Sequence, residues 1–203
     1  MRKLWLMAAL CSPLAQAEVV QVDANSMVRL PANVSVLKLE KLDVADYGTL
    51  LIPASVSQVD IDQLHLGHES RIVIVPADHG IDLSVGYAVL DQGSQISTRG
   101  APGTFEKPAK PARDLNLKIQ ALQADQLAID ARGGTGAPGF AGLDGGNGAE
   151  PGCTWGAAGA GANGDDGGNG HQGAAGARVR VELPRDFPDE QIKVLVDGGA
   201  GGK

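Results

Sequence analysis

Two stretches of this chain place a glycine at every third position: GGTGAPGFAGLDGGNG at residues 133–148 and GDDGGNGHQGAAG at residues 164–176. The glycines in this period are Gly133, Gly136, Gly139, Gly142, Gly145 and Gly148, followed by Gly164, Gly167, Gly170, Gly173 and Gly176. The polyproline II helix has three residues per turn, and glycine is required where such helices pack too closely for a Cβ atom. An α-helix repeats every ~3.6 residues and a strand every two, so neither needs this spacing. The period therefore predicts a polyproline II module in which these glycines are structural.

Polyproline II helices have no internal hydrogen bonds, so their amide groups must bond to neighbouring chains or to water. Three arrangements satisfy this requirement: a trimer wound from three chains, a bundle folded from one chain, or a solvated flexible loop. The period-three runs are short, and Pro138 is the one proline between their glycines, whereas collagen contains about 15–20% proline. The sequence therefore favours a compact bundle that docks on the rest of the chain.

The segment from Gly133 to Gly176 resembles the Gly-x-y repeats of secreted bacterial collagen-like proteins. The resemblance covers about a fifth of the chain. It implies a surface, matrix or adhesive role without catalysis.

Short apolar runs precede this segment and predict an all-β fold, because apolar and polar residues mostly alternate in them. One set of apolar positions recurs after 22 residues: Leu37, Leu39, Leu42, Val44, Leu50 and Ile52 correspond to Val59, Ile61, Leu64, Leu66, Ile72 and Ile74. Weaker copies begin at Ile81 and Leu115. A repeat of about 20–25 residues built from short strands is typical of a β-solenoid. A sandwich of antiparallel strands with similar spacing is the alternative.

The first residues have the pattern of a secretory signal peptide. Arg2 and Lys3 precede the apolar run Leu4–Leu10, and Ala15-Gln16-Ala17 forms a small-x-small cleavage site. The apolar run is shorter than the ~20 residues that span a bilayer, so we expect no transmembrane segment after its removal. The sequence thus predicts a protein that is exported to the periplasm or secreted.

Four parts follow from these patterns. They are a signal peptide at 1–17, a β-rich repeat domain at 18–132, the glycine-rich module at 133–177, and a strand pair with a glycine-rich tail at 178–203. Strand-like residues precede a glycine array three times, before Gly100, Gly133 and Gly198.

Composition narrows the classes of partner. The formal net charge is −7 and no basic run is present, which argues against binding to nucleic acid. Cys153 is the single cysteine outside the predicted signal peptide, so it either forms a disulfide between chains or remains a free thiol. We expect other proteins or glycans at the cell surface as partners, and homo-oligomerisation through Cys153 is one route to assembly.

Histidine and carboxylate groups are the candidate residues for chemistry in this sequence. His65 and His68 are three residues apart in an expected strand and point to opposite faces, so they do not predict a zinc site, even with His79. Other acidic residues either follow glycine turns, where they suggest calcium, or recur in the β repeats, where they suggest glycoside hydrolysis: Asp144, Asp165 and Asp166, and Asp60, Asp62, Asp82 and Asp91. Solvated surface positions explain these acids better. We therefore predict no catalytic, cofactor-binding or metal-binding residues.

The sequence as a whole predicts a non-catalytic, secreted structural or adhesive protein. Two alternatives remain open at this point. One is a module that binds glycans or ice on a regular glycine-rich lattice. The other is a β-helix enzyme that acts on polysaccharides.

Overall fold

A computed structural model describes residues 18–150 and 158–203. The fold is all-β, as predicted, and the helical element in these residues is a single 3-10 turn at Asp189–Gln191. One set of strands comprises β1 (Glu18–Val22), β3 (Val36–Val44), β5 (Gln58–Leu66), β7 (Ile81–Leu90), β9 (Leu115–Ala124) and β11 (Val179–Glu182). The other comprises β2 (Met27–Arg29), β4 (Thr49–Ile52), β6 (Arg71–Ile74), β8 (Gln95–Ser97), β10 (Leu127–Asp130) and β12 (Ile192–Leu195).

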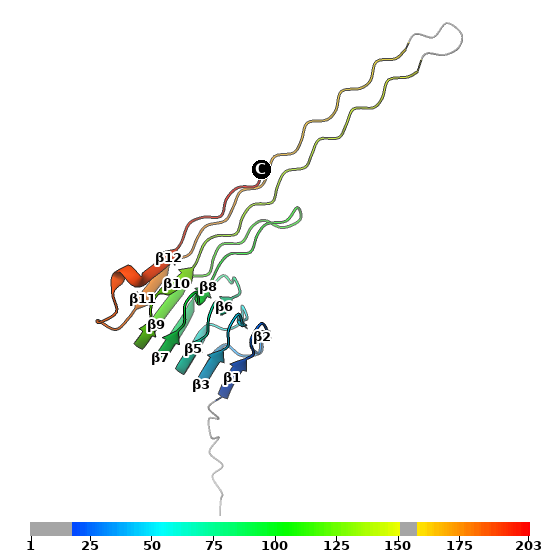
Figure 1. The fold of residues 1–203 in the computed structure, drawn as a ribbon. Helices are drawn as coiled ribbons and strands as arrows, with labels where there is room; N and C mark the ends of the chain where they lie inside the picture. Colours follow the sequence, from blue (N-terminus) through cyan, green and yellow to red (C-terminus); the bar gives the residue numbers. More distant parts are fainter. Residues whose placement is uncertain (1–17, 151–157) are drawn as a thin grey trace, which may run out of the picture.

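Successive strands alternate between two six-stranded sheets. The odd-numbered strands form one sheet in the order β1-β3-β5-β7-β9-β11, and the even-numbered strands form the other in the order β12-β10-β8-β6-β4-β2 (Figure 1). Every strand pair in the described residues is parallel. The antiparallel pairing expected for a sandwich is therefore not the pairing that these residues adopt.

The 22-residue repeat is the register of the first strand pairs. Leu37 on β3 lies beside Val59 on β5, and Leu50 on β4 lies beside Ile72 on β6. Each apolar position of the repeat thus stacks directly on its copy in the next strand of the same sheet. The two strands after the glycine-rich segment continue this stacking, because β11 pairs with β9 and β12 pairs with β10 rather than with each other.

Aliphatic side chains fill the space between the two sheets. Along β3 and β5 the inward residues are buried and their neighbours face solvent, which is the alternation that a half-buried strand requires. Leu42, Leu64 and Ala88 form one stack across β3, β5 and β7, and each is at most 2% exposed. Burial of each leucine contributes about 1.5–3 kcal/mol, so the core is stable without aromatic anchors.

We call the two sheets and the core between them the body. Glycine-rich segments leave the body at one edge of the even-numbered sheet. They follow β8, β10 and β12, which are neighbours in that sheet. Parallel neighbours have their carboxyl ends on the same side, so the three connections emerge side by side (Figure 1). This placement explains why a strand followed by glycines occurs three times in the sequence.

Arg113 fastens the connection after β8 to the body. Its side chain is 1% exposed, and its guanidinium donates hydrogen bonds to the backbone carbonyls of Val56 (2.6 Å), His79 (2.9 Å) and Gly80 (3.2 Å). Burial lowers the pKa of Arg113 from its ordinary value. The carbonyls that it bonds lie in two different connections, β4–β5 and β6–β7, so one side chain joins three connections at this end of the core.

We expect the substitution Arg113→Met to destabilise the protein by roughly 2–3 kcal/mol, since it keeps an apolar side chain but leaves buried carbonyls without their donor. Chemical denaturation of the purified protein measures the change. The exposed Lys110 provides the control, and Lys110→Met should change stability by less than about 0.5 kcal/mol. Equal stability of the Arg113 variant and the native protein would show that the cost of burying the charge cancels its hydrogen bonds.

Candidate functional site

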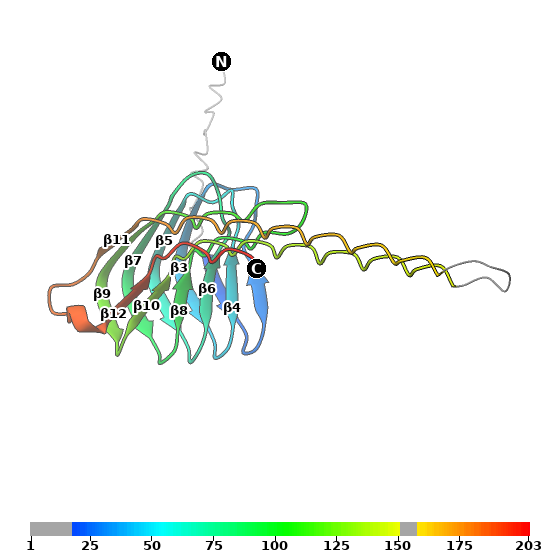
Figure 2. The same cartoon turned by 90° about the horizontal axis from the view of Figure 1, so that it is seen from above.

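Three segments without strand or helix structure form an arm that extends far beyond the two sheets (Figures 1 and 2). The first segment, residues 133–150, follows β10, and the second, residues 158–177, leads back to β11. The third segment, residues 197–203, follows β12 and lies along the part of the arm nearest the body. The arm is the candidate functional site, because it is the largest feature that the core does not require.

Backbone hydrogen bonds join the first and second segments at intervals of three residues. The amides of Gly168, His171 and Ala174 donate to the carbonyls of Phe140, Ala137 and Gly134, each over 2.9 Å. The same step continues outward with Asp165 to Leu143 and Ala162 to Gly146, again over 2.9 Å. This regular ladder gives the arm a fixed register along its whole described length.

The third segment closes a ring of hydrogen bonds around the base of the arm. Gly133, Gly136 and Gly139 of the first segment donate to Asp197 (2.9 Å), Ala200 (2.8 Å) and Lys203 (3.0 Å) of the third. Gly199 and Gly202 of the third donate in turn to Ala174 (2.7 Å) and His171 (2.9 Å) of the second. Each segment therefore donates to one neighbour and accepts from the other, which satisfies backbone groups that have no partner within their own segment.

The period-three glycines lie where the segments touch. A Cβ atom on each glycine of the first segment would overlap a carbonyl oxygen of the second: Gly133 with Ala174, Gly136 with His171, Gly139 with Gly168, Gly142 with Asp165, Gly145 with Ala162, and Gly148 with Gly159. Gly170 and Gly173 meet the third segment in the same way, at the carbonyls of Gly202 and Gly199, and Gly176 meets the carbonyl of Val196, the residue just before that segment. A Cβ at Gly164 or Gly167 would lie 2.8 or 2.9 Å from a carbonyl of the first segment. The structure thus brings the eleven predicted glycines to backbone contacts, whereas Cys153 lies outside the described residues.

Further contacts at the base of the arm were not predicted from the sequence. Gly199 and Gly202 of the third segment face the carbonyls of Gly134 and Ala137. Their three-residue spacing was the signal that could have identified them. In the connection after β8, Phe105 stacks on Phe140 of the arm with ring centroids 4.5 Å apart, and no sequence pattern links these two residues.

An ion pair holds the chain where β10 becomes the arm. The guanidinium of Arg132 donates two hydrogen bonds to the carboxylate of Asp130, over 2.9 and 2.8 Å. Asp130 is 5% exposed, and the hydrogen bonds from Arg132 hold its pKa below the ordinary value. Arg132 also donates its backbone amide to the same carboxylate (3.2 Å), so the pair stabilises the local conformation of the chain between β10 and the arm.

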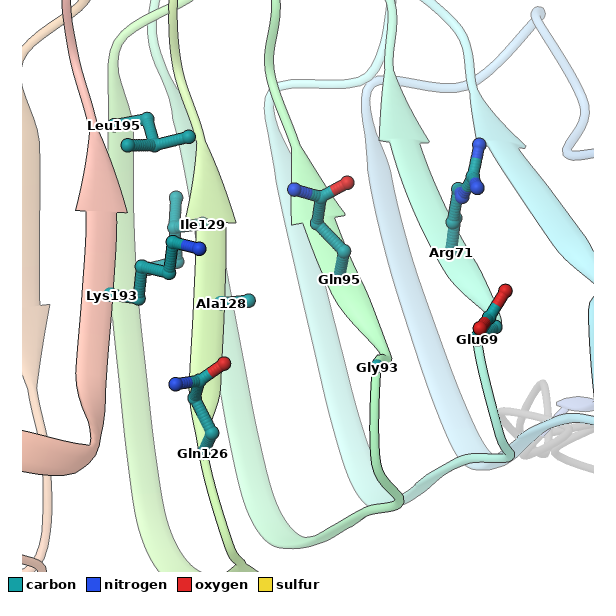
Figure 3. A pocket seen from close by; sticks show the side chains of 9 residues that line it. All are labelled: Glu69, Arg71, Gly93, Gln95, Gln126, Ala128, Ile129, Lys193 and Leu195. Atoms are coloured by element: carbon teal, nitrogen blue, oxygen red, sulfur yellow. The ribbon is translucent and has the colours of Figure 1, made fainter.

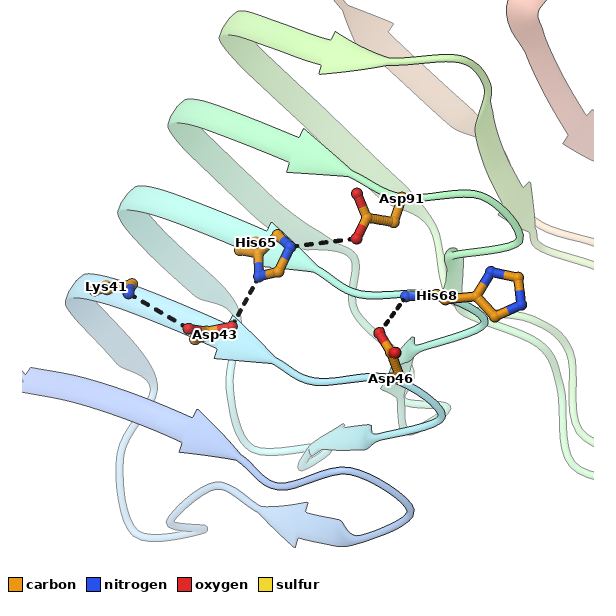
Figure 4. A network of polar contacts seen from close by, with 6 residues as sticks. All are labelled: Lys41, Asp43, Asp46, His65, His68 and Asp91. Atoms are coloured by element: carbon orange, nitrogen blue, oxygen red, sulfur yellow. Dashed lines mark hydrogen bonds and ion pairs between the residues drawn. The ribbon is translucent and has the colours of Figure 1, made fainter.

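A second polar cluster lies on the outer face of the odd-numbered sheet (Figure 4). His65 contacts Asp43 through Nδ1 (2.9 Å) and Asp91 through Nε2 (3.5 Å), and Lys41 contacts the other oxygen of Asp43 (3.4 Å). The hydrogen bond to Asp43 raises the pKa of His65, and the same bond lowers the pKa of Asp43. His68 points away from this cluster (Figure 4).

The three histidines considered for zinc do not converge. The ring of His68 lies edge-on to Tyr47, and Nδ1 of His79 lies 2.9 Å from the guanidinium of Arg113. In the part of the chain that the structure describes, no group of three or more His, Cys, Asp or Glu side chains is arranged to hold a metal ion.

We expect the pKa of His65 to lie above 6.5 and to fall towards 6.5 in the variant Asp43→Asn, since the raised value depends first on Asp43. Its contribution to stability is complete below pH 6.5 and is lost as the pH rises through the pKa of the folded state. NMR titration of the imidazole protons measures this pKa. Asp60→Asn is the control, because Asp60 does not contact His65, and an unchanged pKa in Asp43→Asn would contradict the assignment.

The carboxylates considered for catalysis are distributed over several surroundings. Asp60 and Asp62 line one shallow depression of about 410 Å³ on the odd-numbered sheet. Asp82 accepts a hydrogen bond from Asn116 (2.8 Å), and Asp91 contacts His65. The structure therefore does not gather the four carboxylates into one site.

The even-numbered sheet also carries a shallow depression, of about 320 Å³. Its polar side chains stand on separate strands and loops and do not point to a common centre (Figure 3): Glu69, Arg71, Gln95, Gln126 and Lys193. Neither depression therefore brings polar groups together as the glycine-rich arm brings its backbone groups together.

Comparison with known proteins found no matching family model, no matching curated protein and no matching solved structure. No helix in residues 18–150 and 158–203 has the length and apolar character needed to cross a membrane.

Proposed function

We propose that this chain is a non-catalytic, exported scaffold that acts in a surface structure, a matrix or adhesion. Its body is a β-solenoid and its arm is a bundle of polyproline II segments. The observation that carries the proposal is the three-residue ladder of hydrogen bonds between residues 133–150, 158–177 and 197–203.

The alternation of strands between two parallel sheets supports the solenoid. The chain adds one strand to each sheet in turn, and the apolar positions of consecutive copies lie side by side. Repeats that contact only their neighbours are characteristic of solenoids. Such a body grows by stacking and provides a stiff base for insertions.

The hydrogen-bond step and the close contacts support polyproline II structure in the arm. Segments with three residues per turn present the same side at every third position, and this is the interval at which the arm's amides bond and its glycines touch. A bundle folded from one chain also accounts for the scarcity of proline. Hydrogen bonds between its segments hold the backbone conformation that proline rings would otherwise impose.

An extended arm suits contact with other molecules better than catalysis does. Most side chains between the glycines of its outer part are exposed, and the arm reaches well past the body (Figure 2). Export rests on the predicted signal peptide at 1–17, and a disulfide between chains rests on Cys153; both lie outside the described residues.

A shortened arm tests the proposal. In the variant, residues 140–168 are replaced by an Asn-Gly turn, which leaves the sheets and the third segment in place. Beads coated with the native protein should be retained on immobilised extracellular proteins or glycans, and beads coated with the variant should lose most of that retention. Equal retention would exclude the arm as the adhesive part, and hydrolysis of a polysaccharide by the native protein would overturn the non-catalytic assignment.

Circular dichroism tests the module separately. The difference between the spectra of the native protein and the shortened variant should have the signature of polyproline II and should be lost cooperatively on heating. A difference spectrum of disordered chain, without a melting transition, would contradict a packed module.

A further inference from the structure

The outer face of the odd-numbered sheet is hollowed along β7 and β9. Three depressions of about 410, 340 and 530 Å³ adjoin one another there. The first shares Ser84 with the second, and the second shares Asn116 with the third. We call the continuous hollow that they form the β7–β9 trough. It follows the chain from Gly86 back to Gly80, which is roughly 20 Å at a rise of about 3.3 Å per residue.

Differences in side-chain size between neighbouring strands produce the trough. Ser84 on β7 lies between Asp60 on β5 and Lys118 on β9 in the paired register. The residues before and after Ser84 are buried, so Ser84 points outward. Gly86, two residues further along β7, adds no side chain. Small residues therefore form the floor of the trough, and the longer side chains of β5 and β9 form its walls.

The two walls offer complementary hydrogen-bonding groups. The β5 wall carries the carboxylates of Asp60 and Asp62, which only accept hydrogen bonds. The β9 wall carries the ammonium group of Lys118, which only donates, and the amide of Gln120, which does both. Among the described residues, the side chains of Ser84, Asp62 and Gln120 form no hydrogen bond or ion pair with another residue. These groups are therefore available to a ligand.

A chain of sugar residues matches the shape and the polarity of the trough. Each sugar hydroxyl can donate to a carboxylate or accept from an ammonium or amide group, so one chain can bond to both walls at once. The walls stand on strands two spacings apart, about 9–10 Å, which leaves room for a single file of sugar rings. The elongated shape favours an oligosaccharide over a monosaccharide.

The charges of the trough favour a neutral ligand. Each of its cations already lies beside a carboxylate: Lys118 and Arg180 beside Glu182, at 3.8 and 3.0 Å, and Arg178 beside Asp114, at 3.6 Å. Three further carboxylates, on Asp60, Asp62 and Asp82, line the trough without a cation beside them. An anionic polymer would therefore be repelled.

The apolar residues of the trough favour a carbohydrate over a peptide. Val85 and Leu117 line it, but each is 1% exposed and belongs to the core. They form no pocket that the apolar side chain of a peptide would fill.

We propose that the β7–β9 trough binds a neutral oligosaccharide chain that lies along β7 and β9. The acceptor wall on β5 and the donor wall on β9, facing each other across a floor of small residues, carry the proposal. The floor and the walls belong to β5, β7, β9 and β11 of the body, so this site is separate from the arm and goes beyond the role proposed for the arm.

Isothermal titration calorimetry of the purified full-length protein tests the ligand class. The probes are linear, neutral tetrasaccharides of glucose, mannose and galactose. At least one should bind at least tenfold more tightly than its own monosaccharide, because a chain contacts more of the trough. A tetramer of galacturonic acid should bind at least tenfold more weakly than that tetrasaccharide. Binding of none of the neutral tetrasaccharides, or equal affinity for the anionic tetramer, would overturn the proposal.

A variant that fills the floor locates the site. Ser84→Ile places a branched apolar side chain in the trough and leaves the core unchanged, so it should weaken binding of the tetrasaccharide at least tenfold. Gln63→Ile is the control, because Gln63 is exposed on the same sheet but lies outside the lining of the three depressions. It should bind as the native protein does. Unchanged affinity in Ser84→Ile would place the ligand elsewhere and overturn the proposal.

A second pair of variants tests the acceptor wall without changing its shape. Asp62→Asn replaces one carboxylate oxygen by a donor and should weaken binding at least threefold. Glu40→Gln is the control, since Glu40 is an exposed carboxylate on β3 outside the trough. Equal affinities of the two variants would contradict the acceptor wall, even where Ser84→Ile lowers the melting temperature.

The outcome for the trough is separable from the outcome for the arm. The variant with the shortened arm should bind the tetrasaccharide as the native protein does, and loss of that binding would overturn the trough as the site. Bead retention that is lost in Ser84→Ile but kept in the shortened variant would support the trough and exclude the arm as the adhesive part.

Discussion

Replacing Gly136 by alanine is expected to separate the segments at the base of the arm. The added Cβ would overlap the carbonyl oxygen of His171, so the first and second segments must move apart and their neighbouring hydrogen bonds must lengthen. Overpacking and the loss of one or two hydrogen bonds together cost roughly 2–3 kcal/mol. Hydrogen exchange of the His171 and Ala174 amides, followed by NMR, should accelerate by at least about tenfold.

Gly146→Ala is the matched control for this experiment. Gly146 lies in the same segment, but a Cβ there has no atom within 4 Å. Its exchange rates should stay close to those of the native protein. If Gly136→Ala and Gly146→Ala behave alike, close contact of the backbones is not the reason for the glycine period.

Replacing Ile72 by alanine is expected to destabilise the body by about 2–5 kcal/mol. Ile72 is fully buried on β6 and lies between Leu50 on β4 and Ile96 on β8. Its loss leaves a cavity that rigid, hydrogen-bonded strands on both sides cannot fill by collapsing. The free energy of unfolding, from urea denaturation monitored by circular dichroism, measures the effect.

Val73 provides the comparison on the same strand. It follows Ile72, points to the opposite face of the sheet and is only partly buried. Val73→Ala should cost about 1 kcal/mol or less. Equal losses at the two positions would mean that the interior between the sheets is not close-packed.

The sequence predicted the body well because its information is local and periodic. The shift of 22 residues that matches Leu37 to Val59 is the shift between paired strands, since stacked copies must present the same apolar positions to the same core. The later copies were harder to recognise. Leu117 pairs with Val181, although the whole first and second segments of the arm separate them along the chain.

The glycine positions of the arm were predicted from their period, but the partners of each segment were not. Glycine at every third residue predicts that another backbone lies close to these positions, but it does not identify the segment to which that backbone belongs. The partner depends on the order of β8, β10 and β12 in the sheet, which places the third segment beside the first two. The contact between Phe105 and Phe140 likewise results from this placement and leaves no pattern in the sequence.

The regular step of the arm also sets how its reach can change. The hydrogen-bond ladder between the first and second segments advances by three residues on each side. Adding or deleting three residues in both segments therefore preserves every remaining contact. With the polyproline II structure proposed for the arm, whose rise is roughly 3.1 Å per residue, each triplet alters the reach by about 9 Å. Indels of other sizes would place a methyl or larger group against a carbonyl. The length of the arm can therefore change only in steps of three residues per segment. Such changes leave the two stacked sheets that hold the arm undisturbed.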